Sequence, residues 1–184
     1  MSNPKTTVTV KKLTGIKELQ WACSMTRRPG MGSKSSLKEM YSCLHSPIRT
    51  QVFKIEIQDL KTFVSVHHVR HRSACGDFVQ SNRKDRGGTG EEDRDTPVQH
   101  GSMKNAQDLI NMAQDRLCYA SSSETVSMMI KIRNAVKLVD PDLADRMVPR
   151  CVFMNGLCPE LRMCKVGLEN VIKMYPQWPG HRIV

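Results

Sequence analysis

The stretch SMKNAQDLINMAQDRL, residues 102–117, decides the fold, because it carries the clearest helical pattern of the chain. We expect this helix to begin at Ser102. Its apolar residues recur at spacings of three and four, which places them on one face of a helix that must pack on a core. That face consists of Ala106, Leu109, Ile110, Ala113 and Leu117.

Toward the C-terminus, a second helix is predicted through about Val139. Ser122 or Ser123 can cap it, and Glu124 lies in its first turn, where a negative charge is favourable. The tail 150–184 contains cysteines and looks irregular. The apolar set of the second helix is Met128, Ile132, Ala135, Val136 and Val139, and Pro141 and Pro149 bracket a short third piece.

Toward the N-terminus, residues 51–57 predict a strand, because their apolar side chains alternate with charged ones. The apolar positions are Phe53, Ile55 and Ile57. One face of this strand should therefore be buried and the other should be wet. Further expected elements are a strand at residues 5–10, a helix at 16–23, a helix from its cap Ser36 to about Leu44, and an extended exit forced by Pro47.

Two segments have no clear period. Residues 62–69 fit either a helix or a strand. Residues 84–101, KDRGGTGEEDRDTPVQHG, are polar and rich in glycine, so we expect a long loop or a lid there.

Length and charge restrict the class of protein. A chain of 184 residues predicts a single domain over residues 1–184. Its formal net charge of +10 favours partners that carry phosphate. Aromatic residues make up only 5%, which argues against a surface that stacks single-stranded bases and favours a small anionic ligand.

The chain contains no run of about 18 apolar residues, and its first residues lack the apolar core of a signal peptide. We therefore expect a soluble, cytoplasmic protein without a membrane segment. Seven cysteines then indicate reduced thiols or metal ligands. Zinc sites usually include a closer cysteine pair than this chain offers, so buried thiols are the favoured interpretation. The metal candidates left open are Cys151, Cys158 and Cys164, completed by Cys118 or His181.

The densest cluster of charge lies in HHVRHRSACGDFVQSNRKDR, residues 67–86, which holds four arginines, three histidines and one lysine. One interpretation is a solvated basic face or a nucleic-acid patch. The other is that Arg70 and Arg72, with His71 between them, bind phosphate or an electron-rich flavin ring, because guanidinium groups match such oxygens bidentately.

Three stretches, which follow one another along the chain in the same order as in the family, resemble the flavin-dependent thymidylate synthase family. RHRSACGDFVQSNR, residues 70–83, is similar to the family's Arg-His-Arg signature with its following Ser and Arg positions. LHSPIRTQVFKIEI, residues 44–57, resembles the upstream His-x-Ser/Thr-Pro element and the strand after it. NAQDLINMAQDRLCYASSSET, residues 105–125, resembles the family helix that ends in Leu-Arg. The likeness spans roughly residues 20–139.

The resemblance implies an α+β fold, a small mixed sheet flanked by helices, and a homotetramer whose active sites borrow residues from several chains. It implies reductive methylation of dUMP, with FAD as cofactor and methylenetetrahydrofolate and NADPH as co-substrates. Arg116 would lie by the pyrimidine carbonyls and stabilise charge that builds there. FAD or folate would be contacted by His45, Arg70, His71, Arg72, Asn105 and Asn111, and the nucleotide by His67, Ser81, Arg83 and Arg116.

The chain also departs from the family pattern. His67 stands where the family has Gln, the family's Asn-Glu pair is replaced around Gly76 and Asp77, and Ser81 to Arg83 fit only with a one-residue insertion. Arg94 is the nearest counterpart of a phosphate-binding arginine. These changes keep two alternatives open. One is methyl or hydroxymethyl transfer to another pyrimidine nucleotide, and the other is a non-catalytic relative that binds nucleic acid.

Overall fold

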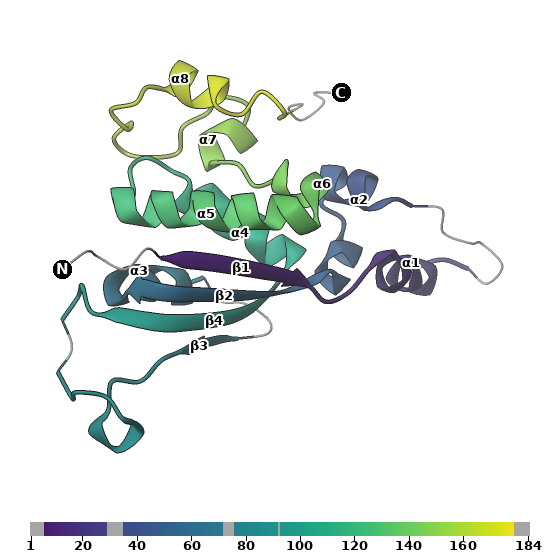
Figure 1. Cartoon of the computed structure of the whole chain (residues 1–184). Coiled ribbons are helices and arrows are strands. Elements are labelled where there is room, and N and C mark those ends of the chain that lie inside the picture. Colours follow the sequence, from purple (N-terminus) through teal and green to yellow (C-terminus); the bar gives the residue numbers. More distant parts are fainter. Residues whose placement is uncertain (1–5, 29–34, 72–75, 92, 179–184) are drawn as a thin grey trace.

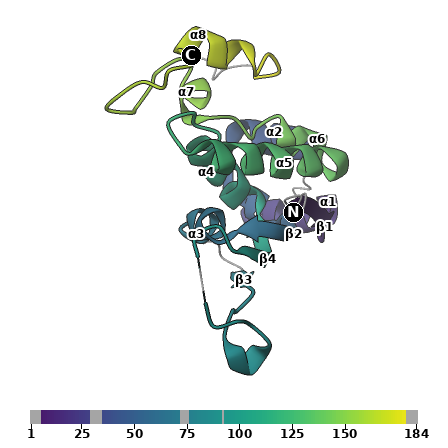
Figure 2. The same ribbon diagram turned by 60° about the vertical axis from the view of Figure 1, so that its left-hand side comes forward.

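The computed structural model describes residues 6–28, 35–71, 76–91 and 93–178. Its centre is a four-stranded open sheet in the order β1-β2-β4-β3, with every pair antiparallel. Helices cover one face of this sheet, and in Figures 1 and 2 the last two helices form a further layer beyond them. The strands are β1 (Thr7–Lys12), β2 (Val52–Lys61), β3 (Asp77–Val79) and β4 (Pro97–Asn105).

The two long helices predicted from the sequence are the ones that lie on the sheet. Their buried faces contain most of the predicted apolar residues, including Leu109, Ala113 and Ile132, which are at most 1% exposed. Val139 was predicted to belong to this face but is 38% exposed, because it is the last residue of its helix. The helical elements are α1 (Ile16–Met25), α2 (Leu37–Cys43), η1 (Ser46–Thr50), α3 (Thr62–Val69), η2 (Lys84–Arg86), α4 (Ala106–Arg116), α5 (Ser123–Val139), α6 (Pro141–Ala144), α7 (Arg150–Phe153) and α8 (Leu168–Lys173). None of the helices in the described ranges is both long and apolar enough to span a bilayer.

Strand β2 confirms the alternation predicted for residues 51–57. Phe53, Ile55 and Ile57 are at most 2% exposed, whereas Lys54 and Glu56 point away from the core. The strand is longer than predicted because it continues to Lys61, with an irregularity in its register to β4 between Ile57 and Leu60. The α+β class is therefore confirmed, but the described pairs make the sheet antiparallel and not mixed.

The prediction for residues 84–105 was wrong in one respect. Strand β4 begins at Pro97, inside the expected loop, and continues to Asn105, so the helix starts at Ala106 and not at Ser102. Residues 102–105 contain one apolar residue, Met103, so neither a helical nor a strand period can be read from them. In the strand, His100, Ser102 and Lys104 take the inward positions, all at most 4% exposed. Polar side chains at core-facing positions hide a strand from a pattern search.

The structure also tests the predictions for the shorter elements and the tail. Ser36 caps α2 as expected, accepting a hydrogen bond from Glu39 N. Residues 62–69 form a helix. Pro47 does not force an extended exit, since it occupies the first turn of the short helix η1. The tail is largely irregular, yet it contributes to the core through Val152, Val171 and Tyr175.

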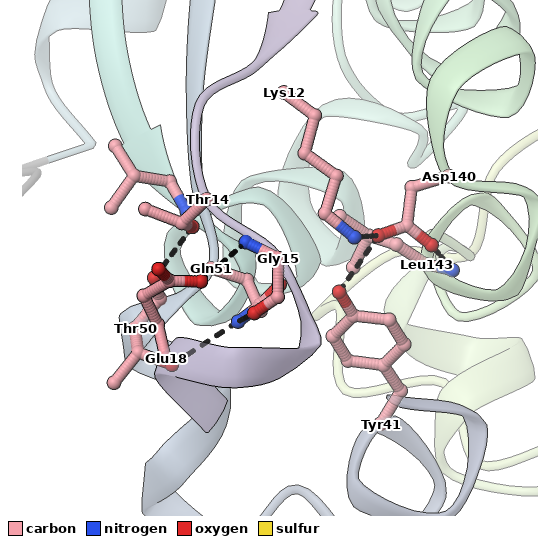
Figure 3. A network of polar contacts seen from close by, with 10 residues as sticks. Lys12, Thr14, Gly15, Glu18, Tyr41, Thr50, Gln51, Asp140 and Leu143 are labelled. Atoms are coloured by element: carbon pink, nitrogen blue, oxygen red, sulfur yellow. Dashed lines mark hydrogen bonds and ion pairs between the residues drawn. The ribbon is translucent and has the colours of Figure 1, made fainter. Parts of the chain in front are cut away.

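A buried carboxylate ties the N-terminal strand to the helices. Asp140, which follows α5, accepts hydrogen bonds from Lys12 Nζ at 2.6 Å and from Tyr41 OH at 2.8 Å, as Figure 3 shows. Its other oxygen accepts a hydrogen bond from Leu143 N. Burial and the Asp140 charge raise the pKa of Tyr41, so its hydroxyl remains a donor at neutral pH. This network joins β1, α2 and α6.

Candidate functional site

Four of the predicted site residues come together where α3 and α4 end. His67, Arg70 and His71 lie at the C-terminal end of α3, and Arg116 is the last residue of α4. Burial lowers the pKa of His67, and the charges of Arg116 and Arg70 lower it further. We call these four residues the α3–α4 cluster. Residues from two separate sequence motifs therefore lie near one another at this position.

Arg116 is the most strongly constrained member of the α3–α4 cluster. Its Nε is buried and has no hydrogen-bond partner among the residues that the structure describes. Burial lowers its pKa, the Asp115 charge raises it, and the nearby Arg70 lowers it again. A guanidinium remains charged in spite of such shifts. The C-terminal end of a helix favours that charge.

His71 is a half-buried neutral ring. Burial lowers its pKa, and the charge of Arg116 adds to this effect. Its Nδ1 lies 3.9 Å from Asp115 Oδ2, and its buried Nε2 has no hydrogen-bond partner within the described ranges. Asp115 is also held by Arg150 at 2.6 Å. The α3–α4 cluster thus contains two buried nitrogens, on Arg116 and His71, for which the described residues provide no hydrogen-bond partner, and such groups in a folded protein call for an explanation.

Arg94 extends the cluster on the side of α3. Its guanidinium lies 4.5 Å from the centre of the Phe63 ring, and that ring makes an edge contact with His67 at 5.8 Å. The Arg94 charge is also among those that lower the pKa of His67. His67 Nδ1 is 2.9 Å from Thr125 Oγ1 in the first turns of α5. Three arginines, Arg70, Arg94 and Arg116, therefore lie around the imidazole of His67.

A buried polar network adjoins the α3–α4 cluster, and it was not predicted from the sequence. Lys104 is 1% exposed, and its Nζ donates a hydrogen bond to Asp77 Oδ2 at 3.2 Å. It also lies 3.0 Å from Oδ1, an ionic contact without hydrogen-bond geometry. His100 Nε2 is 3.5 Å from the same Oδ1, and its Nδ1 is 2.8 Å from Ser65 Oγ. Burial alone would raise the pKa of Asp77, but His100 and Lys104 outweigh it and lower that pKa.

A serine, a histidine and an aspartate in a row invite comparison with a hydrolase triad. Ser65 is only 1% exposed, so its hydroxyl cannot reach a substrate from solvent. The carboxylate is already neutralised by Lys104. We therefore assign the network to the support of β3, β4 and α3.

Other predicted residues lie away from the α3–α4 cluster. Asn105 caps the opposite end of α4, where its Oδ1 accepts a hydrogen bond from Asp108 N. Eleven helical residues at about 1.5 Å each separate it from Arg116 by roughly 16 Å. Asn105 is also only 5% exposed, so its side chain is buried. Asn111 is exposed at mid-helix and accepts a hydrogen bond from Gln107, and His45 is an exposed cap of η1.

The expected phosphate-binding pair lies on the loop after β3. Ser81 is partly buried, and Arg83 is exposed. Asp85 already holds the Arg83 guanidinium at two points, 2.9 and 2.7 Å. A phosphate would have to displace that carboxylate. Arg72 and Cys75 lie outside the described residues.

The four cysteines that were open as metal candidates lie elsewhere. Cys118, Cys151, Cys158 and Cys164 line one small cavity between the end of α4 and the segment from α7 to α8. A larger cavity, of about 340 Å³, lies between the end of β2, α3 and α5, where Lys61, Glu124 and Lys131 line it. None of the predicted ligand residues lines either of these cavities, apart from the cysteines.

No model of a known protein family matches this chain, and no curated protein matches it at a significant level.

Proposed function

We propose that this protein is a flavin-dependent enzyme that methylates a pyrimidine deoxynucleotide, with dUMP as the substrate. The observation that supports it best is the α3–α4 cluster, because two of the three stretches that resemble the family meet there. Arg70 and His71 come from the first of these stretches and Arg116 from the second. The net charge of +10 is consistent with a phosphate-bearing ligand.

The residues of the cluster fit an anionic, oxygen-rich group. Arg116 and His71 each keep a buried nitrogen without a partner in the described part of the chain, and Arg70 is exposed beside them. FAD and a pyrimidine nucleotide both present phosphate and ring carbonyl oxygens. Burial is the main cause that lowers the pKa of Arg116, and the charge of Arg70 lowers it further, so an anion that binds beside them would stabilise both charges. Arg70 and His71 would therefore hold FAD, with Arg72 from the neighbouring segment.

Each residue of the cluster then has a task. Arg116 would bind the pyrimidine carbonyls and stabilise negative charge there, which a fixed and partly desolvated guanidinium does well. His67, positioned by Thr125, would contact the base. When bound, FAD supplies hydride chemistry, methylenetetrahydrofolate supplies the carbon unit, and NADPH reduces the flavin. The residues of the chain itself bind and orient FAD and the nucleotide, and they stabilise the negative charge on the pyrimidine.

The nature of the base is a second question within the same proposal. His67 replaces the family's Gln, and one of its ring nitrogens is already engaged by Thr125. An imidazole offers fewer hydrogen bonds to a uracil edge than an amide does. Methyl or hydroxymethyl transfer to another pyrimidine nucleotide is therefore the alternative that this position favours. Titration with dUMP, dCMP and dTMP distinguishes the two.

An absorbance spectrum tests the class. The purified protein, supplied with FAD, is expected to show bound-flavin bands near about 450 nm. Arg70→Ala should weaken FAD binding by roughly tenfold to a hundredfold, because a charge-assisted hydrogen bond contributes about 1.5–3 kcal/mol. Arg28→Ala is the matched control, since Arg28 is exposed and follows α1, at the opposite end of the sheet from α3 in Figure 1.

Two results would contradict the proposal. One is a protein that takes up no flavin at any FAD concentration but binds single-stranded DNA with a steep salt dependence, which would identify a nucleic-acid-binding relative. The other is equal loss of FAD in Arg70→Ala and Arg28→Ala, which would mean that general charge and not the cluster attracts the cofactor.

A further inference from the structure

The cavity of about 340 Å³ lies where α3 passes the first turns of α5. Figure 1 shows both helices beside the N-terminal end of β1. Sites for small organic ligands measure about 300–1,000 Å³, so this cavity has room for one. No residue of the α3–α4 cluster is among its lining residues. These are Thr6, Leu60, Lys61, Val64, Ser123, Glu124, Ser127, Met128 and Lys131.

The buried side of the cavity is apolar. Leu60 at the end of β2, Val64 in α3 and Met128 in α5 are 1%, 2% and 5% exposed. These side chains belong to the core and come from three different elements, so close packing fixes the shape of this side. An apolar surface with a few polar groups around it is the usual composition of a small-molecule site.

One wall of the cavity is a single face of α5. Glu124, Ser127, Met128 and Lys131 follow one another at spacings of three and four, so they lie on the same side of the helix. Glu124 and Lys131 are seven residues apart, which is about 10 Å along the helix axis. The cavity is therefore elongated, with the acidic side chain toward one end, the basic side chain toward the other and a hydroxyl group between them.

The charges at the Glu124 end balance one another. Lys61 Nζ lies 2.9 Å from Asp95 Oδ1. The hydrogen bond to Asp95 raises the pKa of Lys61, and the charge of Glu124 raises it further. Lys61 and Arg94 are in turn the positive charges near Glu124. Two cations and two carboxylates therefore meet at this end, which should not attract a further ion.

Lys131 at the other end has no acidic partner in the part of the chain that the structure describes. Its ammonium group donates one hydrogen bond, at 3.1 Å, to the backbone oxygen of Thr6. A lysine has three such donors. Ser127 is exposed one turn before it and adds a hydroxyl donor. The lining therefore leaves one positive charge to be neutralised, together with donors for oxygen atoms.

We propose that this cavity binds a small monocarboxylate with an apolar body, at a site separate from the α3–α4 cluster. The carboxylate accepts hydrogen bonds from Lys131 Nζ and Ser127 Oγ, and the apolar body lies on Leu60, Val64 and Met128. A phosphate dianion fits less well, because one lysine neutralises one charge and Glu124 repels the second. The described lining also contains no arginine that could hold phosphate oxygens bidentately.

Calorimetric titration of the full chain without flavin or nucleotide tests the site with probes that differ in one property. Benzoate has the charge and the apolar body, benzyl alcohol lacks the charge, and acetate lacks the body. Benzoate is expected to bind at one site per chain, roughly tenfold to a hundredfold more tightly than benzyl alcohol or acetate. Phenyl phosphate should bind no more tightly than benzoate.

Variants place the benzoate in the cavity. Lys131→Met keeps most of the side-chain stem without the charge and should weaken benzoate binding by roughly tenfold or more. Lys137→Met is the matched control, because Lys137 is exposed on the same helix and is not a lining residue. Ser127→Phe, at an exposed position, fills the cavity and should abolish binding while Lys131 remains. Far-UV circular dichroism of each variant shows whether it has folded.

Several results would overturn the proposal. They are no measurable benzoate binding up to about 10 mM, equal binding of benzyl alcohol, tighter binding of phenyl phosphate, and equal losses in Lys131→Met and Lys137→Met. Arg70→Ala should leave the benzoate affinity unchanged, and a loss there would place the anion in the α3–α4 cluster instead. The titration measures no flavin, so the site can fail or hold independently of the proposed function.

Discussion

Arg116 combines a full positive charge with a buried Nε that no described residue satisfies. Sequence resemblance selected this residue, and the structure adds the physical reason why it could matter. A guanidinium that is partly desolvated interacts more strongly with a developing charge than one in water. At the scale of single residues, Arg116 can act in two ways: it can bind the nucleotide, or it can raise the rate of the reaction.

Arg116→Lys separates the two roles. The lysine keeps the charge but loses the planar fork that can hold two oxygens. If Arg116 stabilises charge on the pyrimidine, single-turnover flavin oxidation should slow by about 10–100-fold, or roughly 1.4–2.7 kcal/mol, while the nucleotide Kd changes little. Arg28→Lys serves as the control. A large loss of affinity with an unchanged rate at saturating nucleotide would identify Arg116 as a binding residue only.

His68 gives a prediction on stability and pH. The ring is 1% exposed, and burial, followed by the charges of His100, Lys104, Arg116 and His71, lowers its pKa from 6.5 to about 3. Between these values the unfolded chain binds a proton that the folded chain does not, so stability rises with pH. Lowering the pH from 7.5 to 5.5 should therefore cost about 1.4 kcal/mol through this residue.

Urea unfolding at the two pH values measures this effect. His68→Phe keeps a ring of similar size and removes the titration, so its loss of stability on acidification should be smaller by about that amount. His67 and His71, whose pKa values are also lowered, contribute to the dependence that remains. An unchanged pH dependence in His68→Phe would show that His68 becomes charged without unfolding.

At the scale of elements, amphipathic segments were predictable and polar interior segments were not. Helices α4 and α5 and strand β2 each carry an apolar face with the right period, so their existence and core residues were found from the sequence. Strand β4 was missed because it places His100, Ser102 and Lys104 toward the core. His100 and Lys104 find polar partners there in Ser65 and Asp77, which lie 35 and 27 residues away in the chain. A local pattern cannot contain a partner at that distance.

The buried pair of Asp77 and Lys104 should hold β3 to β4. Asp77→Asn leaves the Lys104 charge buried without its carboxylate, which typically costs about 3–5 kcal/mol. The double variant Asp77→Leu/Lys104→Met replaces both charges and should cost clearly less than Asp77→Asn. Urea unfolding followed by circular dichroism measures each free energy.

The neighbouring strand offers a matched control for that pair. Lys54 and Glu56 also lie 3.0 Å apart, but both are about half exposed. Glu56→Gln should therefore cost less than about 1 kcal/mol. If the buried and exposed substitutions cost the same, or if the double variant costs the sum of its single variants, the buried pair does not stabilise the sheet as inferred.

At the scale of the whole molecule, the sequence predicted the class of fold and part of the candidate site. The resemblance assigns Arg70 and His71 to FAD and His67 and Arg116 to the nucleotide, and these four residues lie near one another. His45 and Asn105 were expected beside them. Asn105, however, caps the opposite end of α4. His45 precedes η1, which lies against that same end of α4 through the hydrogen bond from Ala106 N to Gln51 O. Within one chain these two groups do not form one pocket.

An active site formed between two chains would bring the two groups of residues together. We propose that, in the homotetramer that the resemblance implies, the η1 end of one 20.9 kDa chain faces the α3–α4 cluster of another. Arg116→Ala and His45→Ala should each be inactive. Co-expressed or refolded together, they should recover activity, because some sites then combine an intact Arg116 from one chain with an intact His45 from its neighbour.

The control for this experiment pairs Arg116→Ala with the double variant Arg116→Ala/His45→Ala. No site in that mixture contains an intact arginine, so no activity should return. Native mass spectrometry establishes that mixed oligomers have formed in both samples. If mixed tetramers are present and the first mixture is no more active than its components, the two groups do not meet across a chain interface. The site would then have to lie within one chain, and His45 and Asn105 would be structural caps without a part in binding FAD.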